Sequence, residues 1–259
     1  MELLQVLSGF LVGVLVGITG VGGGSLLTPL LVLVFGVAPT TAVGTDLMFA
    51  AITKASGAWV HARNHRVDWR LVRQLMLGSV PAALATLVLL RTLVVNGKEL
   101  AFLITPVLGV ALLLTALGLL FKTQILTYRA RFRRPDYLPE TAPLTMPVVF
   151  LGAMLGVLVT LSSVGAGALG VSVLLILRPH LPTHKIVGSD IAHAVPLTLV
   201  AGLGYWTLQA INWELLMTLL VGSIPGIWLG SHFGHRLPER ILRVGLASLL
   251  TVIAVKFVL

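Results

Sequence analysis

The chain has 259 residues, of which 57% are hydrophobic and only 10% are charged, and its mean hydropathy is +1.01. Soluble domains carry about 25% charged residues, so this composition excludes an ordinary soluble protein and indicates an all-α polytopic membrane protein. The absence of cysteine excludes disulfides, thiol chemistry and cysteine-ligated metals.

The formal net charge of +9 comes from 18 basic and 9 acidic residues. Fourteen of the basic residues form four clusters between or at the ends of apolar segments: Arg63, Arg66, Arg70 and Arg73; Lys122, Arg129, Arg131, Arg133 and Arg134; Arg178 and Lys185; and Arg236, Arg240 and Arg243. Basic loops of this kind lie on the cytoplasmic side, near anionic lipid. The charge therefore favours membrane lipid over nucleic acid as a partner.

Ten apolar segments are expected in chain order. They cover residues 4–18, 24–36, 43–61, 70–92, 99–122, 144–161, 167–178, 186–207, 213–232 and 240–258. We divide the chain into a first membrane repeat, 1–122, a basic linker, 123–143, and a second membrane repeat, 144–259. A signal peptide is not expected, because Glu2 stands where a basic region would begin one.

Charge placement also predicts the topology. If each segment reverses the side of the chain, the four basic clusters share one face, and only Arg91, Lys98 and Lys256 lie near the other. This asymmetry predicts a cytoplasmic linker and both termini outside. The prediction is the same whether the short segments span the membrane or are re-entrant.

The two halves are related by an internal repeat. Residues 43–46, Val-Gly-Thr-Asp, return as residues 187–190, Val-Gly-Ser-Asp, and residues 77–81 match 221–225 at the same offset of 144. An odd number of crossings in each half makes the second copy enter the membrane from the opposite side. Inverted repeats are typical of secondary transporters that work by alternating access.

Two glycine-rich breaks interrupt the apolar segments at residues 18–25 and 161–168. A helix that begins inside the membrane presents unpaired amides and a positive dipole end, which together bind anions. The expected substrate-binding residues of the breaks are Thr19, Gly20, Gly22, Gly23, Gly24, Ser25, Ser162, Ser163, Gly165 and Gly167. The alternative is that the glycines only allow a tight turn and close helix packing.

At these residues the chain resembles a known family. The break at 20–25 with Pro29 after it, the 39–46 segment that opens the next helix, the degenerate second copy and the basic central loop resemble the sulfite exporter TauE/SafE family, also called the 4-toluene sulfonate uptake permeases. The resemblance covers essentially the whole chain. It implies a permease of a bacterial or archaeal inner membrane for small sulfur-containing anions such as sulfite, thiosulfate or organosulfonates.

Ionisable residues inside a membrane are costly and indicate function. Asp46 and Asp190 occupy equivalent positions, and His193 follows Asp190 on the same helical face. We expect these three residues to couple transport to protons; helix N-caps are the alternative for the two aspartates. Lys54 either neutralises the bound anion or extends towards the cytoplasmic end of its helix.

Thr45 and Ser189, which precede the aspartates, complete the expected substrate site. The expected partners are a small anion, protons and lipid, with a homodimer left open, and no metal, cofactor or catalytic residue is expected. An anion channel is the closest alternative function. A membrane enzyme is less favoured, because the histidine pairs lack acidic companions that could complete a metal site.

Overall fold

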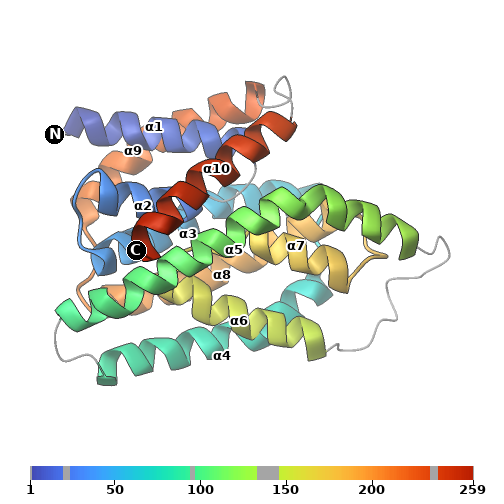
Figure 1. Cartoon of the computed structure of the whole chain (residues 1–259), viewed down its shortest axis with the longest axis horizontal. Coiled ribbons are helices and arrows are strands. Elements are labelled where there is room, and N and C mark those ends of the chain that lie inside the picture. The colour runs from blue at the N-terminus through green and yellow to red at the C-terminus, as the bar shows by residue number, and fades with distance from the viewer. Residues whose placement is uncertain (1, 20–23, 94–96, 133–145, 234–238, 259) are drawn as a thin grey trace.

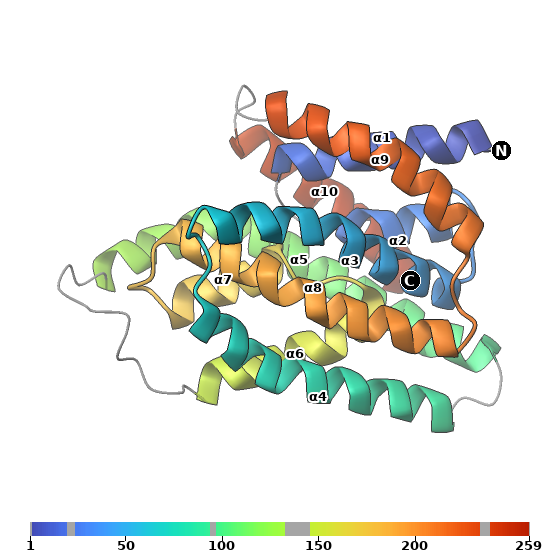
Figure 2. The same ribbon diagram turned by 180° about the vertical axis from the view of Figure 1, so that it is seen from behind.

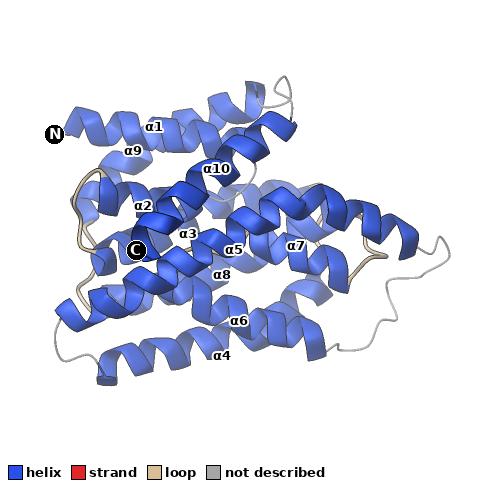
Figure 3. Cartoon of the chain, viewed as in Figure 1, coloured by secondary structure: helices blue, strands red, loops and turns tan. Residues whose placement is uncertain are grey.

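The computed structural model describes residues 2–19, 24–93, 97–132, 146–233 and 239–258, and all the regular structure in these ranges is helical (Figures 1 and 3). The helices are α1 Glu2–Thr19, α2 Gly24–Leu33, α3 Pro39–Arg63, α4 Trp69–Leu93, α5 Gly97–Phe132, α6 Met146–Ser162, α7 Ala168–Leu177, α8 Thr183–Thr207, α9 Trp213–Phe233 and α10 Glu239–Val258. Each expected apolar segment therefore contains a helix.

Prolines and local packing explain where the helix boundaries differ from expectation. Pro39 is the first residue of α3 and Pro182 immediately precedes α8, so both helices begin before the expected apolar segments. Helix α5 continues into the expected linker as far as Phe132. Ile125 and Leu126 in this extension pack against a buried apolar cluster beside α7, which stabilises the additional turns.

Several of these helices can cross a membrane. Within the described residues, four are long and apolar enough to do so, and they contain the spans Trp69–Thr92, Ile104–Thr127, Thr183–Thr207 and Trp213–Gly230. Helices α2 and α7 have only 10 residues each, or about 15 Å at roughly 1.5 Å per residue. Neither can cross a hydrocarbon core of about 30 Å by itself.

Helices α3 and α8 form an antiparallel pair in the middle of the molecule (Figure 2). The beginning of α8 lies beside the end of α3, because Gly188 is close to the backbone of Arg66 and to the His61 ring. At the other end, Gly44 of α3 lies against Tyr205 and Ala210. Around this pair, α1 packs along α9, α4 along α6 and α5 along α10.

Glycines allow two of these helix pairs to approach closely. A Cβ atom on Gly9 or Gly13 of α1 would lie 2.4 Å from the carbonyl oxygen of Leu219 or Ser223 in α9. The same clash would arise in the α6–α4 pair. A Cβ atom on Gly152 would lie 2.3 Å from the Leu75 carbonyl oxygen, and one on Gly156 would lie 2.4 Å from the Ser79 carbonyl oxygen. The contacting positions of the two pairs are 143 or 144 residues apart. Equivalent positions therefore make equivalent contacts.

Candidate functional site

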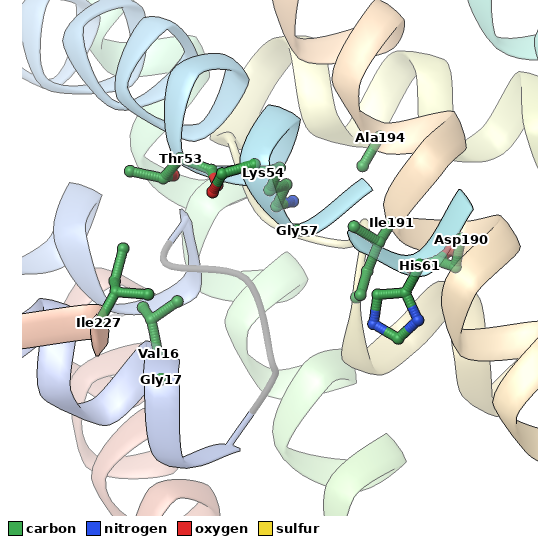
Figure 4. Close-up of a pocket in the computed structure, with 12 residues that line it drawn as sticks. Val16, Gly17, Thr53, Lys54, Gly57, His61, Asp190, Ile191, Ala194 and Ile227 are labelled. Carbon is green, nitrogen blue, oxygen red and sulfur yellow. The ribbon is translucent and has the colours of Figure 1, made fainter. Parts of the chain in front are cut away.

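A cavity of about 240 Å³ lies between the α1–α9 pair and the central α3–α8 pair, beside the second break (Figure 4). It is lined by Val16, Gly17, Thr53, Lys54, Ser56, Gly57, His61, Gly167, Asp190, Ile191, Ala194 and Ile227. The walls from α1 and α9 are apolar, whereas α3 and α8 contribute the ionisable groups. One cation and one carboxylate therefore share a mostly apolar chamber.

Lys54 contributes the cation. Its side chain is only 8% exposed, and its Nζ donates a hydrogen bond to the carbonyl oxygen of Ala166 in the second break, at 3.3 Å. The ammonium also interacts electrostatically with Asp190 and Asp46. Lys54 thus points into the protein towards the second break and does not extend towards the C-terminal end of α3.

Asp190 contributes the carboxylate. It is fully buried and lies so close to Gly170 of α7 that a Cβ atom there would overlap its Oδ1. Within the described residues neither carboxylate oxygen has a hydrogen bond of regular geometry, although the Gly167 amide is near enough to interact with the carboxylate. The start of α7 and the Lys54 ammonium therefore supply the positive potential around Asp190.

The second break has a backbone that requires glycine. Gly165 and Gly167 have φ values of 120° and 122°, a region that side chains other than glycine rarely adopt. Gly167 is the N-cap of α7 and lines the cavity. This geometry starts a helix inside the protein, next to Lys54.

The two serines of this break, Ser162 and Ser163, are not among the residues that line the cavity. The Ser162 hydroxyl donates to the Leu158 carbonyl at 2.6 Å and accepts from the Val164 amide at 3.2 Å. Ser163, with φ of 58°, is buried beside the Asp46 carboxylate. The break thus meets α3 at two places: Ser163 lies beside Asp46, and the Ala166 carbonyl oxygen accepts a hydrogen bond from Lys54.

The first break is described only at its edges. Gly20, Gly22 and Gly23 lie outside the described residues. Thr19 ends α1, and Gly24 and Ser25 begin α2, but the description of these residues extends to the backbone alone. Gly17 and Val16, which precede this break, line the cavity.

Asp46 has different surroundings from Asp190. Its Oδ2 accepts hydrogen bonds from the Thr28 amide, at 3.2 Å, and from the Thr28 hydroxyl. The N-cap alternative for both aspartates is wrong, because the caps of α3 and α8 are Ala38 and Pro182 and each aspartate lies two turns inside its helix. Asp46 therefore anchors α2 to α3.

Three further expected site residues lie away from the cavity lining. The Thr45 hydroxyl accepts a hydrogen bond from the backbone N–H of Asn212, at 3.1 Å. The equivalent Ser189 hydroxyl accepts one from the backbone N–H of Asp68, at 2.8 Å. Each hydroxyl thus holds the loop that precedes α9 or α4. His193 is fully buried and its Nε2 shares a hydrogen bond of 2.8 Å with the Ser79 hydroxyl of α4.

Four lining residues on α3 were not predicted from the sequence: Thr53, Ser56, Gly57 and His61. Thr53, Gly57 and His61 are spaced four residues apart, so they share one helical face. A polar and small face within an otherwise apolar segment was the signal that could have identified them. The apolar lining from α1, α8 and α9 has no such signal.

Comparisons with known proteins show the family to which the chain belongs. The family model described as sulfite exporter TauE/SafE matches residues 5–257. The Bacillus subtilis protein YjnA, described as a probable membrane transporter, is 35% identical over 258 residues and the alignment covers 100% of both chains. YdhB of the same organism is 27% identical over 241 residues, covering 93% of this chain and 94% of YdhB.

A membrane transporter of Xylella fastidiosa (strain Temecula1), also described as probable, is 29% identical over 232 residues, covering 89% of this chain and 84% of that protein. No solved structure matches the chain. The relatives are described as transporters and not as enzymes. With the family model and the relatives matching nearly end to end, this chain belongs to the sulfite exporter TauE/SafE family of multi-pass membrane transporters.

Proposed function

We propose that this protein is a secondary transporter that moves small sulfur-containing anions, of the sulfite, thiosulfate or organosulfonate class, across the inner membrane. The observation that carries the proposal is the meeting of Lys54 with the start of α7 at a cavity inside the protein. A buried ammonium and a helix N-terminus both attract anions. The family to which the chain belongs supplies the sulfur class of the substrate.

The size and the walls of the cavity suit a small anion. Its volume of about 240 Å³ compares with roughly 30 Å³ for one water molecule, so it accommodates a small oxyanion together with a few waters. The apolar side chains Val16, Ile191 and Ile227 suit the organic part of a sulfonate. Within the proposal, Gly20, Gly22, Gly23 and Gly24, with the Thr19 and Ser25 hydroxyls, contribute to the same site from the first break.

The charges around the cavity support proton coupling. An entering anion would meet the Asp190 carboxylate next to Lys54, and two negative charges close together in an apolar chamber repel each other strongly. Protonation of Asp190 removes this repulsion and leaves the Lys54 ammonium to the anion. Asp46 and His193 belong to the same proposal as further proton carriers, because both are buried near this region.

Alternating access between two inverted repeats is the proposed mechanism. Support comes from the antiparallel packing of α3 and α8, which hold equivalent sequence positions, and from the glycine contacts that recur in α1–α9 and α6–α4. The basic clusters favour a cytoplasmic linker and external termini. In this scheme the cavity opens to one side of the membrane at a time.

A transport assay in proteoliposomes tests the function. Uptake of labelled sulfite, thiosulfate, a sulfonate and a carboxylate is measured with and without a proton gradient. We expect saturable, gradient-dependent uptake of at least one sulfur anion, with counterflow. Carboxylate transport alone would overturn the substrate class, and a large unitary conductance without gradient dependence would show an anion channel instead.

Variants of Lys54 test the site itself. Lys54→Met keeps the side-chain volume but removes the charge, and we expect it to lower uptake by roughly thirtyfold or more, equivalent to about 2 kcal/mol of lost anion stabilisation. Lys54→Arg should retain part of the activity. Lys256→Met, at an exposed position on α10, is the matched control. Wild-type uptake by Lys54→Met would overturn the site.

A further inference from the structure

His61 and Tyr205 occupy equivalent positions in the two repeats, 144 residues apart. His61 lies near the end of α3 and Tyr205 near the end of α8. Because these two helices are antiparallel, the two side chains lie at opposite ends of the central pair. The separation along the pair is about 25 Å, from the roughly 17 residues of α8 between Gly188 and Tyr205 at 1.5 Å each.

The two residues also make equivalent contacts. A Cβ atom on Gly188 would lie close to the Arg66 carbonyl oxygen and 3.2 Å from the His61 Nδ1. A Cβ atom on Gly44 would lie close to the Ala210 carbonyl oxygen and 2.9 Å from the Tyr205 ring. Gly44 is equivalent to Gly188, and Ala210 to Arg66, at the same offset of 144. Equivalent residues therefore make equivalent contacts at the two ends of the α3–α8 pair.

The state of the two ends differs. At the first end, His61 is partly exposed and lines the cavity together with Asp190. At the second end, Tyr205 is fully buried among apolar side chains, and the equivalent aspartate, Asp46, is bonded to Thr28 of α2. The first end is thus open to the cavity and the second end is closed.

The Tyr205 hydroxyl is the unexplained group at the closed end. Within the described residues it has no hydrogen-bond partner, although an unsatisfied buried hydroxyl costs about 1–3 kcal/mol. In the closed arrangement the hydroxyl therefore adds no hydrogen bond that would stabilise tyrosine over phenylalanine at this position. The hydroxyl is explained if the site becomes hydrated or meets the substrate in another arrangement of the protein.

We infer that Tyr205 closes a second mouth of the substrate pathway, equivalent to the open mouth that His61 lines. This inference rests on the proposed transport function and adds to it the location of both mouths and the residues that close the second one. When the second mouth opens, the Thr28–Asp46 contact breaks and Asp46 faces the anion pathway as Asp190 does here. The Tyr205 hydroxyl then faces water or the passing anion.

Single-cysteine labelling tests the inference directly, because the natural chain has no cysteine. Tyr205→Cys and His61→Cys proteins are treated in sealed vesicles with a membrane-impermeant cationic thiol reagent, from each side separately. We expect His61→Cys to react from one side only and Tyr205→Cys from the opposite side only. Leu250→Cys, at a buried position of α10, is the control that stays unlabelled.

Thr28→Val should shift the balance between the two mouths, because the Thr28 hydroxyl donates to Asp46 at the closed end. Removing the Thr28 hydroxyl weakens the closed end, so labelling at Tyr205→Cys should rise by roughly fivefold or more while labelling at His61→Cys falls. Labelling of both cysteines from the same side, or no labelling of Tyr205→Cys while the protein turns over, would overturn the inference. Opposite-sided labelling without transport of any sulfur anion would instead refute only the substrate assignment.

Tyr205→Phe provides a second test that does not depend on a cysteine. If the hydroxyl has no role when the second mouth opens, its removal leaves uptake unchanged, and this result would also overturn the inference. We expect uptake to fall by roughly fivefold or more while the melting temperature is retained or raised, because the variant removes an unsatisfied buried group.

Discussion

At the scale of single residues, Asp46 and Asp190 show how two equivalent positions acquire different chemistry. Both are fully buried and both follow a glycine and a hydroxyl residue. Asp46 receives two hydrogen bonds from Thr28, whereas Asp190 faces the cavity with Lys54 as its nearby cation. The position equivalent to Lys54 in the second half is Thr198, whose hydroxyl bonds to its own helix, so Lys54 has no counterpart cation and serves as the neighbour of both aspartates.

Asp190→Asn tests this difference. The amide keeps the shape of the side chain and resembles the protonated acid, so we expect anion binding to be retained while the stimulation of uptake by a proton gradient is lost. The pH dependence of KM, measured in proteoliposomes, should flatten. Asp46→Asn is the matched comparison, with weakened contacts to Thr28. An unchanged pH dependence in Asp190→Asn would contradict the coupling role.

At the scale of helices, small residues decide which elements act as one body. Gly9 and Gly13 bring α1 against the backbone of α9, and Gly222 and Gly226 do the same from the other side. Such backbone contact is typical of tight helix pairs in membranes. The α1–α9 pair forms one wall of the cavity through Val16, Gly17 and Ile227. We therefore regard this pair as one rigid wall.

Gly13→Ala tests the packing of this wall. The new Cβ would lie 2.4 Å from the Ser223 carbonyl oxygen, and backbone atoms cannot move aside easily, so we expect a loss of about 1–3 kcal/mol. The loss is measured as a lower melting temperature of the purified protein. Gly245→Ala, whose Cβ would meet nothing within 4 Å, is the control and should be neutral or slightly stabilising. Equal stability of the two variants would contradict the packing argument.

At the scale of the whole molecule, each outer helix pair combines the two repeats. Helix α1 packs along α9, and α4 along α6, so each of these pairs joins a helix of the first half to a helix of the second. The cavity lies between the α1–α9 pair and the central helices (Figure 4). Alternating access in this fold therefore predicts movement of the outer pairs against α3 and α8.

Paired cysteines joined by a short cross-linker measure this movement. Gln5 and Thr218 share a hydrogen bond of 3.1 Å between α1 and α9, so a cross-link between Gln5→Cys and Thr218→Cys should leave uptake intact. Val16 and Thr53 line the cavity from α1 and α3, and a cross-link between Val16→Cys and Thr53→Cys should stop uptake until it is reduced. The reverse pattern would show that the α1–α9 pair does not move as one body.

The sequence alone was sufficient for the membrane class, the ten apolar segments and the presence of ionisable residues inside helices. These properties follow from hydropathy, periodicity and charge placement, which act over one or two helical turns. Glycine positions likewise located the second break, because the φ values of Gly165 and Gly167 are local properties of the backbone. The helix ends were less well predicted, since packing of Ile125 and Leu126 extends α5.

Only the tertiary structure decided what each polar residue contacts. The Lys54–Ala166 hydrogen bond joins residues 112 positions apart, and the bonds of Thr45 and Ser189 to distant loop amides join residues 167 and 121 positions apart. Such contacts depend on how helices pack, and each residue type involved has several satisfactory partners. For this reason the sequence identified Asp46, Asp190 and Lys54, and the packing of α2, α7 and α8 around α3 assigned their different surroundings.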